Sequence, residues 1–206
     1  RKRELLSYLI GSGNWRQVLV FTRTKHLANR LSKQLEQDGL SAAAIHGNKT
    51  QGARERALAA FRAGTLRALV ATDIAARGLD VKGVSHVFNF DAPWHPDDYV
   101  HRIGRTGRAG RDGKAILFIT PKETRLLRSI EKSTRQTISP LTMPSNEQVS
   151  DQRIMQFTNQ LVKTLETPRL DKFRDLITKF AAENELDMAD IAAALTYENQ
   201  KERPLF

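Results

Sequence analysis

The chain has 206 residues, of which 40% are hydrophobic and 27% charged, so it can form the core of one ordinary domain and a smaller second one. No apolar run approaches the roughly 20 residues of a membrane span, and the absence of Cys excludes disulfides, thiolate metal sites and cysteine nucleophiles. The net charge of +10 favours a polyanionic partner, nucleic acid first among them.

Short apolar runs alternate with helical patterns through residues 1–144. Apolar runs rich in β-branched and aromatic residues predict buried strands at residues 17–22, 41–45, 66–71, 84–90 and 114–119. Apolar residues at helical spacing predict helices at residues 24–37, 50–62, 97–103 and 122–133. Strands that alternate with helical crossovers indicate an α/β fold, with a parallel, doubly wound sheet and helices on both faces.

A domain boundary is predicted near residue 144, because Pro140 and Pro144 break the pattern and the charge changes sign there. Residues 1–144 carry a net charge of +13, and residues 145–206 carry −3. The spacing of apolar residues in 145–206 predicts three helices and no strand, with Asp187 as a candidate cap of the third helix. One face of each helix is apolar: Ile154, Phe157, Leu161 and Leu165; Leu170, Phe173, Leu176, Ile177 and Phe180; Ile191, Ala194 and Leu195.

The apolar faces of residues 145–206 exceed what so small a helical domain can bury by itself. We therefore expect part of this surface to contact another body. The simplest arrangement is a homodimer, and the alternative is packing onto the first domain within a monomer.

Polar clusters follow four of the predicted strands directly. They are Thr22 to Lys25, His46 to Lys49, Thr72 and Asp73 with Arg77 to Asp80 beyond them, and Asp91. Because ligands of open α/β sheets bind beyond the carboxyl ends of the strands, these clusters predict a binding site at one edge. The alternative is that they are ordinary polar turns. The excess of basic residues also has an alternative explanation, namely a basic surface that only contacts solvent.

The segment HRIGRTGRAGR at residues 101–111 places four arginines among glycines. Guanidinium groups bind phosphate through bidentate hydrogen bonds, and glycines let the backbone approach a ligand closely. The segment begins inside a predicted helix, which favours a shaped phosphate site over a loop that holds RNA nonspecifically.

A complete nucleotide-hydrolysing site is not expected in this chain. The sequence contains no GxxxxGK[ST] phosphate loop and no acidic motif suited to nucleotide Mg²⁺. Arginines that serve a phosphate held elsewhere act as arginine fingers. The five His residues do not pair at metal-ligand spacing, so no metal site is expected. The chain opens Arg-Lys-Arg without an initiator Met, and we expect it to be a piece of a longer protein.

In motif order, residues 1–144 resemble the second RecA-like domain of DEAD-box ATP-dependent RNA helicases. VLVFTRTK (18–25) resembles motif IV, and Gln51 with Arg54 resembles the QxxR element. VATDIAARGLDV (70–81) resembles motif V, and residues 101–111 resemble motif VI. The helical tail resembles the dimerisation segment that follows the core in bacterial cold-shock helicases of this family.

The resemblance implies a nucleotide-binding role for four residues. Arg105 and Arg108 would be the arginine fingers on the ATP phosphates, and His101 would couple ATP to the interdomain cleft. Asp80 would accept a hydrogen bond from the ATP ribose, or would instead cap a turn. Mg²⁺ would be held by the missing first domain.

The resemblance also implies contacts with RNA and with the first domain. Arg23, Gly47 and Thr72 would touch the RNA sugar-phosphate backbone, which makes binding largely independent of base sequence. Arg77 and Arg102 would make closing contacts to the N-terminal RecA-like domain in cis. The alternatives are that Thr72 only ends a strand and that Arg102 pairs with an acid inside its own domain.

The implied function is ATP-driven unwinding of short RNA duplexes by domain closure, in ribosome assembly, RNA decay or cold adaptation in the cytoplasm. This chain would be the C-terminal half of such an enzyme and inactive alone. A rival hypothesis is a non-catalytic RNA-binding and dimerisation module, which explains the charge but not the motif VI spacing. A DNA-directed helicase of the same superfamily is disfavoured, because the residues of motifs V and VI closely match the DEAD-box pattern.

Overall fold

A computed structural model describes residues 2–13, 15–77, 81, 84–107, 112–200 and 205. The chain divides into two compact units, residues 1–142 and residues 143–206. Each unit is described by itself below.

The first unit is built on a five-stranded sheet with the strand order β2-β3-β1-β4-β5. The strands are β1 (Val18–Thr22), β2 (Ala42–Ile45), β3 (Ala68–Thr72), β4 (His86–Asn89) and β5 (Lys114–Leu117). All four pairs of neighbouring strands are parallel. The predicted parallel α/β fold is therefore confirmed. The chain crosses from β3 over β1 to β4, so the polar segments after these strands come together at one edge.

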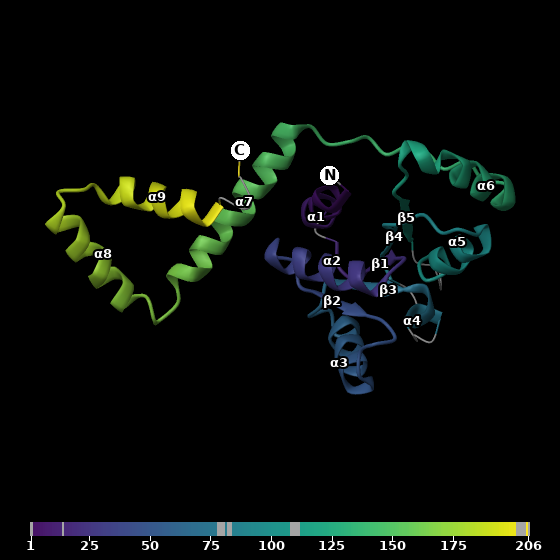
Figure 1. The fold of residues 1–206 in the computed structure, drawn as a ribbon, viewed down its shortest axis with the longest axis horizontal. Coiled ribbons are helices and arrows are strands. Elements are labelled where there is room, and N and C mark those ends of the chain that lie inside the picture. The colour runs from purple at the N-terminus through teal and green to yellow at the C-terminus, as the bar shows by residue number, and fades with distance from the viewer. Residues whose placement is uncertain are drawn as a thin grey trace. The chain divides into compact units, whose positions relative to one another are not determined.

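Seven helical segments accompany the sheet among the described residues (Figure 1). They are α1 (Lys2–Ser12), α2 (Lys25–Gln37), α3 (Gln51–Arg62), α4 (Asp73–Arg77), α5 (Pro96–Ile103), the 3₁₀ turn η1 (Pro121–Glu123) and α6 (Thr124–Thr134). Thr24 and Thr50 begin α2 and α3 by accepting hydrogen bonds from N–H groups of the first turn. Gly39 and Gly64 follow the ends of these helices with φ of 75°, a conformation that favours glycine.

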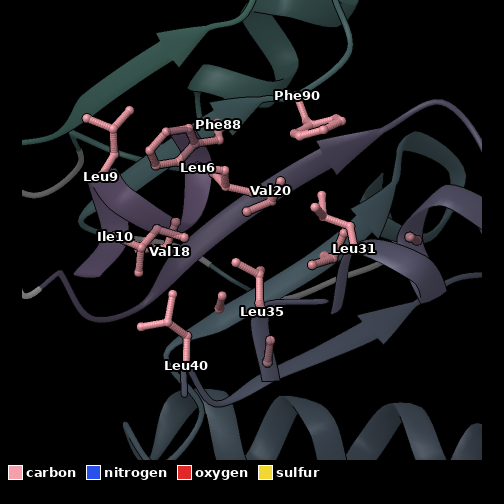
Figure 2. Packing of buried hydrophobic residues seen from close by; sticks show 14 of the residues in the cluster. Leu6, Leu9, Ile10, Val18, Val20, Leu31, Leu35, Leu40, Phe88 and Phe90 are labelled. Atoms are coloured by element: carbon pink, nitrogen blue, oxygen red, sulfur yellow. The ribbon is translucent and has the colours of Figure 1, made fainter. Parts of the chain in front are cut away.

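The two faces of the sheet bury different side chains because successive strand residues alternate in direction. Val18 and Val20 of β1 pack with α1 and α2, in the cluster that Figure 2 shows. Leu19 and Phe21 lie on the opposite face, in a cluster with Phe61 of α3 and Ala76 of α4. Helices therefore cover both faces, as the sequence predicts.

Two helices of this unit were not anticipated from the sequence. In α1, Leu6, Leu9 and Ile10 are buried against the sheet, and their spacing of three and four residues was a usable signal. The guanidinium of Arg67 fixes the end of α1 by donating to the carbonyls of Ile10 and Trp15. Helix α4 is only one turn long and lies within the motif V segment.

The second unit contains α7 (Asn146–Leu165), α8 (Asp171–Glu183) and α9 (Met188–Gln200). Ser145 and Gln148 form a reciprocal capping box at the start of α7. Asp187 accepts a hydrogen bond from the N–H of Ala189, which confirms the predicted cap of α9. Among the described residues of this unit, only Ala181 and Ile191 are buried hydrophobics. Within the described part of the chain, no helix is long and apolar enough to cross a membrane.

Candidate functional site

The carboxyl edge of the sheet gathers the predicted polar segments. β1 and β3 end side by side, with Thr22 paired in register to Thr72. The segment with His46 and Gly47 follows β2, and Asp91 follows β4 two residues beyond Asn89. Parallel pairing places the predicted polar segments at the same edge of the sheet, and the binding site predicted there stays a prediction.

Arg102 of α5 connects several segments at this edge through hydrogen bonds, and it is only 2% exposed. Its Nε and Nη2 atoms donate to the two carboxylate oxygens of Asp73, at 2.7 and 2.8 Å. Nη1 donates to the side-chain oxygen of Asn89 at 3.0 Å and to the carbonyl of Asp91 at 2.8 Å. The guanidinium therefore joins α5 to α4 and to the end of β4. It also lies 5.2 Å from the ring centre of Phe21.

The predicted closing contact of Arg102 with a first domain stays a prediction. Within this unit the side chain makes the ion pair with an internal acid that we considered as the alternative. Four of the five N–H groups of a guanidinium are used by the acceptors named above.

Arg105 lies in a turn whose backbone is fixed on both sides. Its N–H donates to the carbonyl of Arg102 at 3.2 Å, and its carbonyl accepts from the N–H of Val84 at 3.2 Å. The Thr106 hydroxyl donates to the carbonyl of Val84 as well. The turn is thereby tied to the segment before β4, and it carries the half-buried side chain of Arg105.

Gly113 is a further feature of this turn that sequence reasoning missed. A Cβ atom at position 113 would collide with the backbone of Gly107 and the hydroxyl of Thr106. Gly107 itself has φ of 64°. The glycines of this segment thus allow two stretches of backbone to touch.

Arg23 begins the segment after β1, and its guanidinium already has partners inside the unit. Nε and Nη2 donate to the carbonyl of Ala92 at 3.2 and 2.9 Å, and Nη2 donates to Glu123 Oε1 at 2.8 Å. Its backbone N–H donates to Asp91 Oδ2 at 2.9 Å. Nη1 has no hydrogen-bond partner among the described residues, so it is the group that can reach a ligand.

The other predicted RNA-contacting residues lie along the same edge. Gly47 is exposed, and a Cβ atom there would meet no described residue within 4 Å other than its chain neighbours. Thr72 is half-buried at the end of β3. Beside Gly47, His46 is buried, and its Nε2 lies 3.0 Å from Asn29 Oδ1. Burial lowers the pKa of His46, and the nearby charges of Lys49, Lys25 and His26 lower it further, so it is neutral at pH 7.

The remaining predicted residues are only partly visible. His101 lies exposed in the last turn of α5. Asp80 and Arg108 fall outside the described residues, and Arg77 is described only as the last residue of α4. Their predicted roles stay predictions.

Among the acceptors that hold the arginines, Asn89 and Glu123 were not singled out from the sequence, and Asp73 was named only as part of a polar cluster. Asp73 and Asn89 hold Arg102, and Glu123 holds Arg23. A signal for Asn89 was present, because an Asn between Phe88 and Phe90 in an apolar strand must be buried with a partner.

The donor set at this edge is suited to phosphate. Guanidinium groups, backbone N–H groups and a Thr hydroxyl fit the oxygens of a nucleotide or of an RNA backbone. Because of these donors, the residues present fit the phosphates of ATP. Among the described residues, no group of three or more His, Cys, Asp or Glu could hold a metal ion.

A parallel α/β unit with arginines beside polar strand ends and in the turn after α5 is the class of domain that the fold and the site define. This chain belongs to the family described as helicase conserved C-terminal domain, whose model matches residues 1–110. Residues 144–206 match the RNA helicase DeaD dimerization domain. The predicted resemblance to DEAD-box helicases is thereby confirmed, and so is the resemblance of the tail to the dimerisation segment of bacterial helicases of this family.

Individual relatives agree with this assignment. The ATP-dependent RNA helicase DeaD of Mycobacterium tuberculosis is 44% identical over 195 residues, which cover 95% of this chain and 35% of that protein. The chain thus spans about a third of the length of the curated relatives it matches.

Solved structures agree as well. The Escherichia coli DEAD-box protein SrmB, bound to regulator of ribonuclease activity A, matches with a TM-score of 0.64 and 36% identity, over 70% of this chain and 91% of that chain. The Saccharomyces cerevisiae protein Dbp5, bound to RNA and ADP BeF3, matches with a TM-score of 0.63 and 33% identity, over 74% of this chain and 41% of that chain.

Proposed function

We propose that this chain is the C-terminal half of an ATP-dependent DEAD-box RNA helicase, which unwinds short RNA duplexes by ATP-driven domain closure. The observation that carries the proposal is the turn with Arg105 in a helicase-family unit, whose backbone is hydrogen-bonded to Arg102 of α5 and to Val84 before β4. A fixed guanidinium can stabilise charge that develops on a phosphate held by a partner domain.

The nucleotide-facing residues then divide the work. Arg105 and Arg108 neutralise the charge on the ATP phosphates, Asp80 accepts from the ribose, and His101 at the end of α5 couples the nucleotide to the interdomain cleft. ATP, with Mg²⁺ held by the first domain, supplies the free energy of hydrolysis. Arg102 keeps the α5 end in place through Asp73. We propose that Arg77 and Arg102 also make the closing contacts to a first domain in cis.

The proposed RNA-facing residues lie at or just beyond the carboxyl ends of β1, β2 and β3. Arg23 through Nη1, the exposed backbone of Gly47 and the hydroxyl of Thr72 contact the sugar-phosphate backbone and leave the bases unread. A strand bent between two closed domains no longer fits in a duplex, so closure melts the duplex locally. The solved structure of Dbp5, a related fold bound to RNA and ADP BeF3, supports RNA and nucleotide binding by this fold.

The test is RNA-stimulated ATP hydrolysis by the full-length protein that contains this chain. Arg105→Ala should lower turnover by roughly 10³- to 10⁵-fold, as expected for a finger, without unfolding the protein. Arg174→Ala, which removes an exposed arginine of α8, is the matched control and should leave turnover unchanged. Near-normal turnover of Arg105→Ala would reject the finger role and favour a non-catalytic RNA-binding module.

We further propose that residues 145–206 make the protein a homodimer. The match to a dimerization domain and the exposed apolar side chains of α7 and α8 support this arrangement. The cytoplasm is the proposed location, and ribosome assembly, RNA decay or cold adaptation is the proposed setting, since the tail resembles that of bacterial cold-shock helicases.

A further inference from the structure

Trp94 is a large aromatic residue left on the surface beside the candidate site. It is 65% exposed, although indole side chains are usually among the more buried. It lies five residues beyond the carboxyl end of β4, between the buried Ala92 and the start of α5 at Pro96. The backbone on both sides is therefore anchored, and the ring is carried on a short, rigid segment.

One face of the ring is covered by Arg23. The guanidinium carbon lies 4.3 Å from the ring centre of Trp94, which is a cation–π contact. The same guanidinium is fixed in its own plane by the carbonyl of Ala92 and by Glu123. Because the residue is still 65% exposed, the other face of the ring is open to solvent.

Glu123 keeps this arrangement charged and in place. Its carboxylate accepts from the N–H and the hydroxyl of Thr120, from Arg23 and from Lys2. Burial raises the pKa of Glu123, but the Thr120 hydrogen bonds, the Lys2 charge and the Arg23 hydrogen bond outweigh it and leave the pKa below its ordinary value. The ion pair with Arg23 thus persists throughout the neutral range.

We propose that Trp94 stacks on a nucleobase of single-stranded RNA, with Arg23 holding the ring from behind. The ligand would lie as a third layer on the open face of the ring, while Nη1 of Arg23 reaches the adjacent phosphate. An aromatic face binds any base, so this contact adds affinity without sequence specificity. The net charge of +13 on residues 1–144 is complementary to RNA and not to an apolar partner.

This inference rests on the proposed RNA-binding function and adds a base contact to a site otherwise expected to touch only sugar and phosphate. The rival occupant of the ring is the first domain of the same protein. The two are distinguished by whether the contribution of Trp94 depends on the presence of a base.

The experiment compares two RNA ligands and three forms of the 206-residue chain. The ligands are a labelled ten-nucleotide oligouridine and an oligomer of the same length whose central nucleotides lack their bases. Wild type, Trp94→Leu and Trp94→Phe are titrated with both by fluorescence anisotropy at low salt. Circular dichroism checks that each variant is folded.

Wild type should bind oligouridine about five- to tenfold more tightly than the abasic oligomer. Trp94→Leu should abolish most of this difference and leave the affinity for the abasic oligomer unchanged. Trp94→Phe should retain most of it, because a phenyl ring still stacks.

Three outcomes would overturn the inference. Equal weakening of both ligands by Trp94→Leu would mean that the ring acts through Arg23 or the fold. An unchanged base-dependent difference, together with lost ATP hydrolysis in the full-length Trp94→Leu protein, would assign the ring to the first domain. If wild type bound neither ligand, the proposed RNA-binding function would fail along with the inference.

Discussion

Arg102 carries a permanent charge at a position from which solvent is almost excluded. The free energy of burying this charge depends on the groups that accept its hydrogen bonds. Asp73, Asn89 and the carbonyl of Asp91 supply hydrogen bonds, and Asp73 also supplies the opposite charge. A buried pair of this kind contributes little net stability compared with apolar residues, but removal of one member leaves the other unpaired. The side chain therefore fixes the position of α5 relative to α4 and the end of β4.

We predict that Arg102→Ala lowers the free energy of unfolding of residues 1–206 by about 2–3 kcal/mol, because Asp73 and Asn89 lose their donor. Urea unfolding followed by circular dichroism measures this. Arg30→Ala, an exposed arginine on α2, should change stability by less than about 0.5 kcal/mol. An unchanged stability for Arg102→Ala would show that this arginine serves only contacts outside the unit.

His86 makes the stability of the first unit depend on pH. Its ring stacks on Trp15 with the centres 3.8 Å apart, and Nε2 is buried with no hydrogen-bond partner among the described residues. Burial, with a further contribution from the charge of Lys114, lowers the pKa of His86 to about 4. In the unfolded chain the pKa returns to about 6.5, so the unfolded state takes up a proton first as the pH falls.

The stabilisation from a neutral His86 is therefore complete above about pH 6.5 and is lost as the pH falls through 4. We predict that wild type loses about 1–2 kcal/mol more stability than His86→Phe between pH 7 and pH 5. The variant keeps an aromatic ring on Trp15 but cannot titrate. Urea titrations at both pH values, with Trp fluorescence as the signal, give the comparison. Parallel losses in the two proteins would contradict the shifted pKa.

At the scale of elements, the sequence predicted best where one physical signal dominates. Every residue of β1 is buried, and an apolar run of that length is hard to place anywhere but in a central strand. The amphipathic spacing of α2 and its ending at Gly39 were equally direct. Strand ends shifted by one or two residues, as for β3 and β4, because the last ladder bonds depend on neighbouring strands.

What could not be predicted depended on tertiary contacts. The spacing of Leu6, Leu9 and Ile10 could have predicted helix α1, but it does not show that these side chains gain their stability by packing on the sheet. The edge of the sheet was predicted as a site from strand ends alone, but the pairing of Arg102 with Asp73 joins residues 29 positions apart. No spacing rule reveals which acid an arginine meets across a fold.

The loop after β2 gives a prediction about RNA contact that is separate from folding. Apart from its two chain neighbours, no described residue lies within 4 Å of a methyl group at Gly47, so Gly47→Ala should alter the unfolding free energy by less than about 0.5 kcal/mol. If RNA backbone lies against this position, the same methyl group should weaken oligouridine binding several-fold. Unfolding titrations and anisotropy on the same sample measure the two effects.

Gly52→Ala on α3 is the matched control for that experiment, since its new Cβ would lie an ordinary 3.5 Å from Arg56 Nη1. It should leave RNA affinity unchanged. Loss of affinity in the control, or none in Gly47→Ala, would remove Gly47 from the RNA site.

At the scale of the whole molecule, the two units differ in how much of their apolar surface they bury. The first unit has a layered core on both faces of its sheet. In the second, α8 leaves Phe173 and Leu176 about two-thirds exposed, and Phe180 is exposed on the same helix face. Apolar surface of this extent marks an interface, and a helical face that meets its own copy gives a twofold dimer.

We predict that residues 1–206 are dimeric at tens of micromolar and that a chain ending at Thr142 is monomeric, measured by light scattering. Phe173→Glu with Phe180→Glu should convert the longer chain to a monomer, since a carboxylate cannot be buried there unpaired. Asp175→Lys changes the charge on the opposite face of α8 and should leave the dimer intact. A monomeric mass for the unmodified chain would mean that the apolar face of α8 packs within one molecule, and a dimeric mass for the shorter chain would place the interface in the first unit.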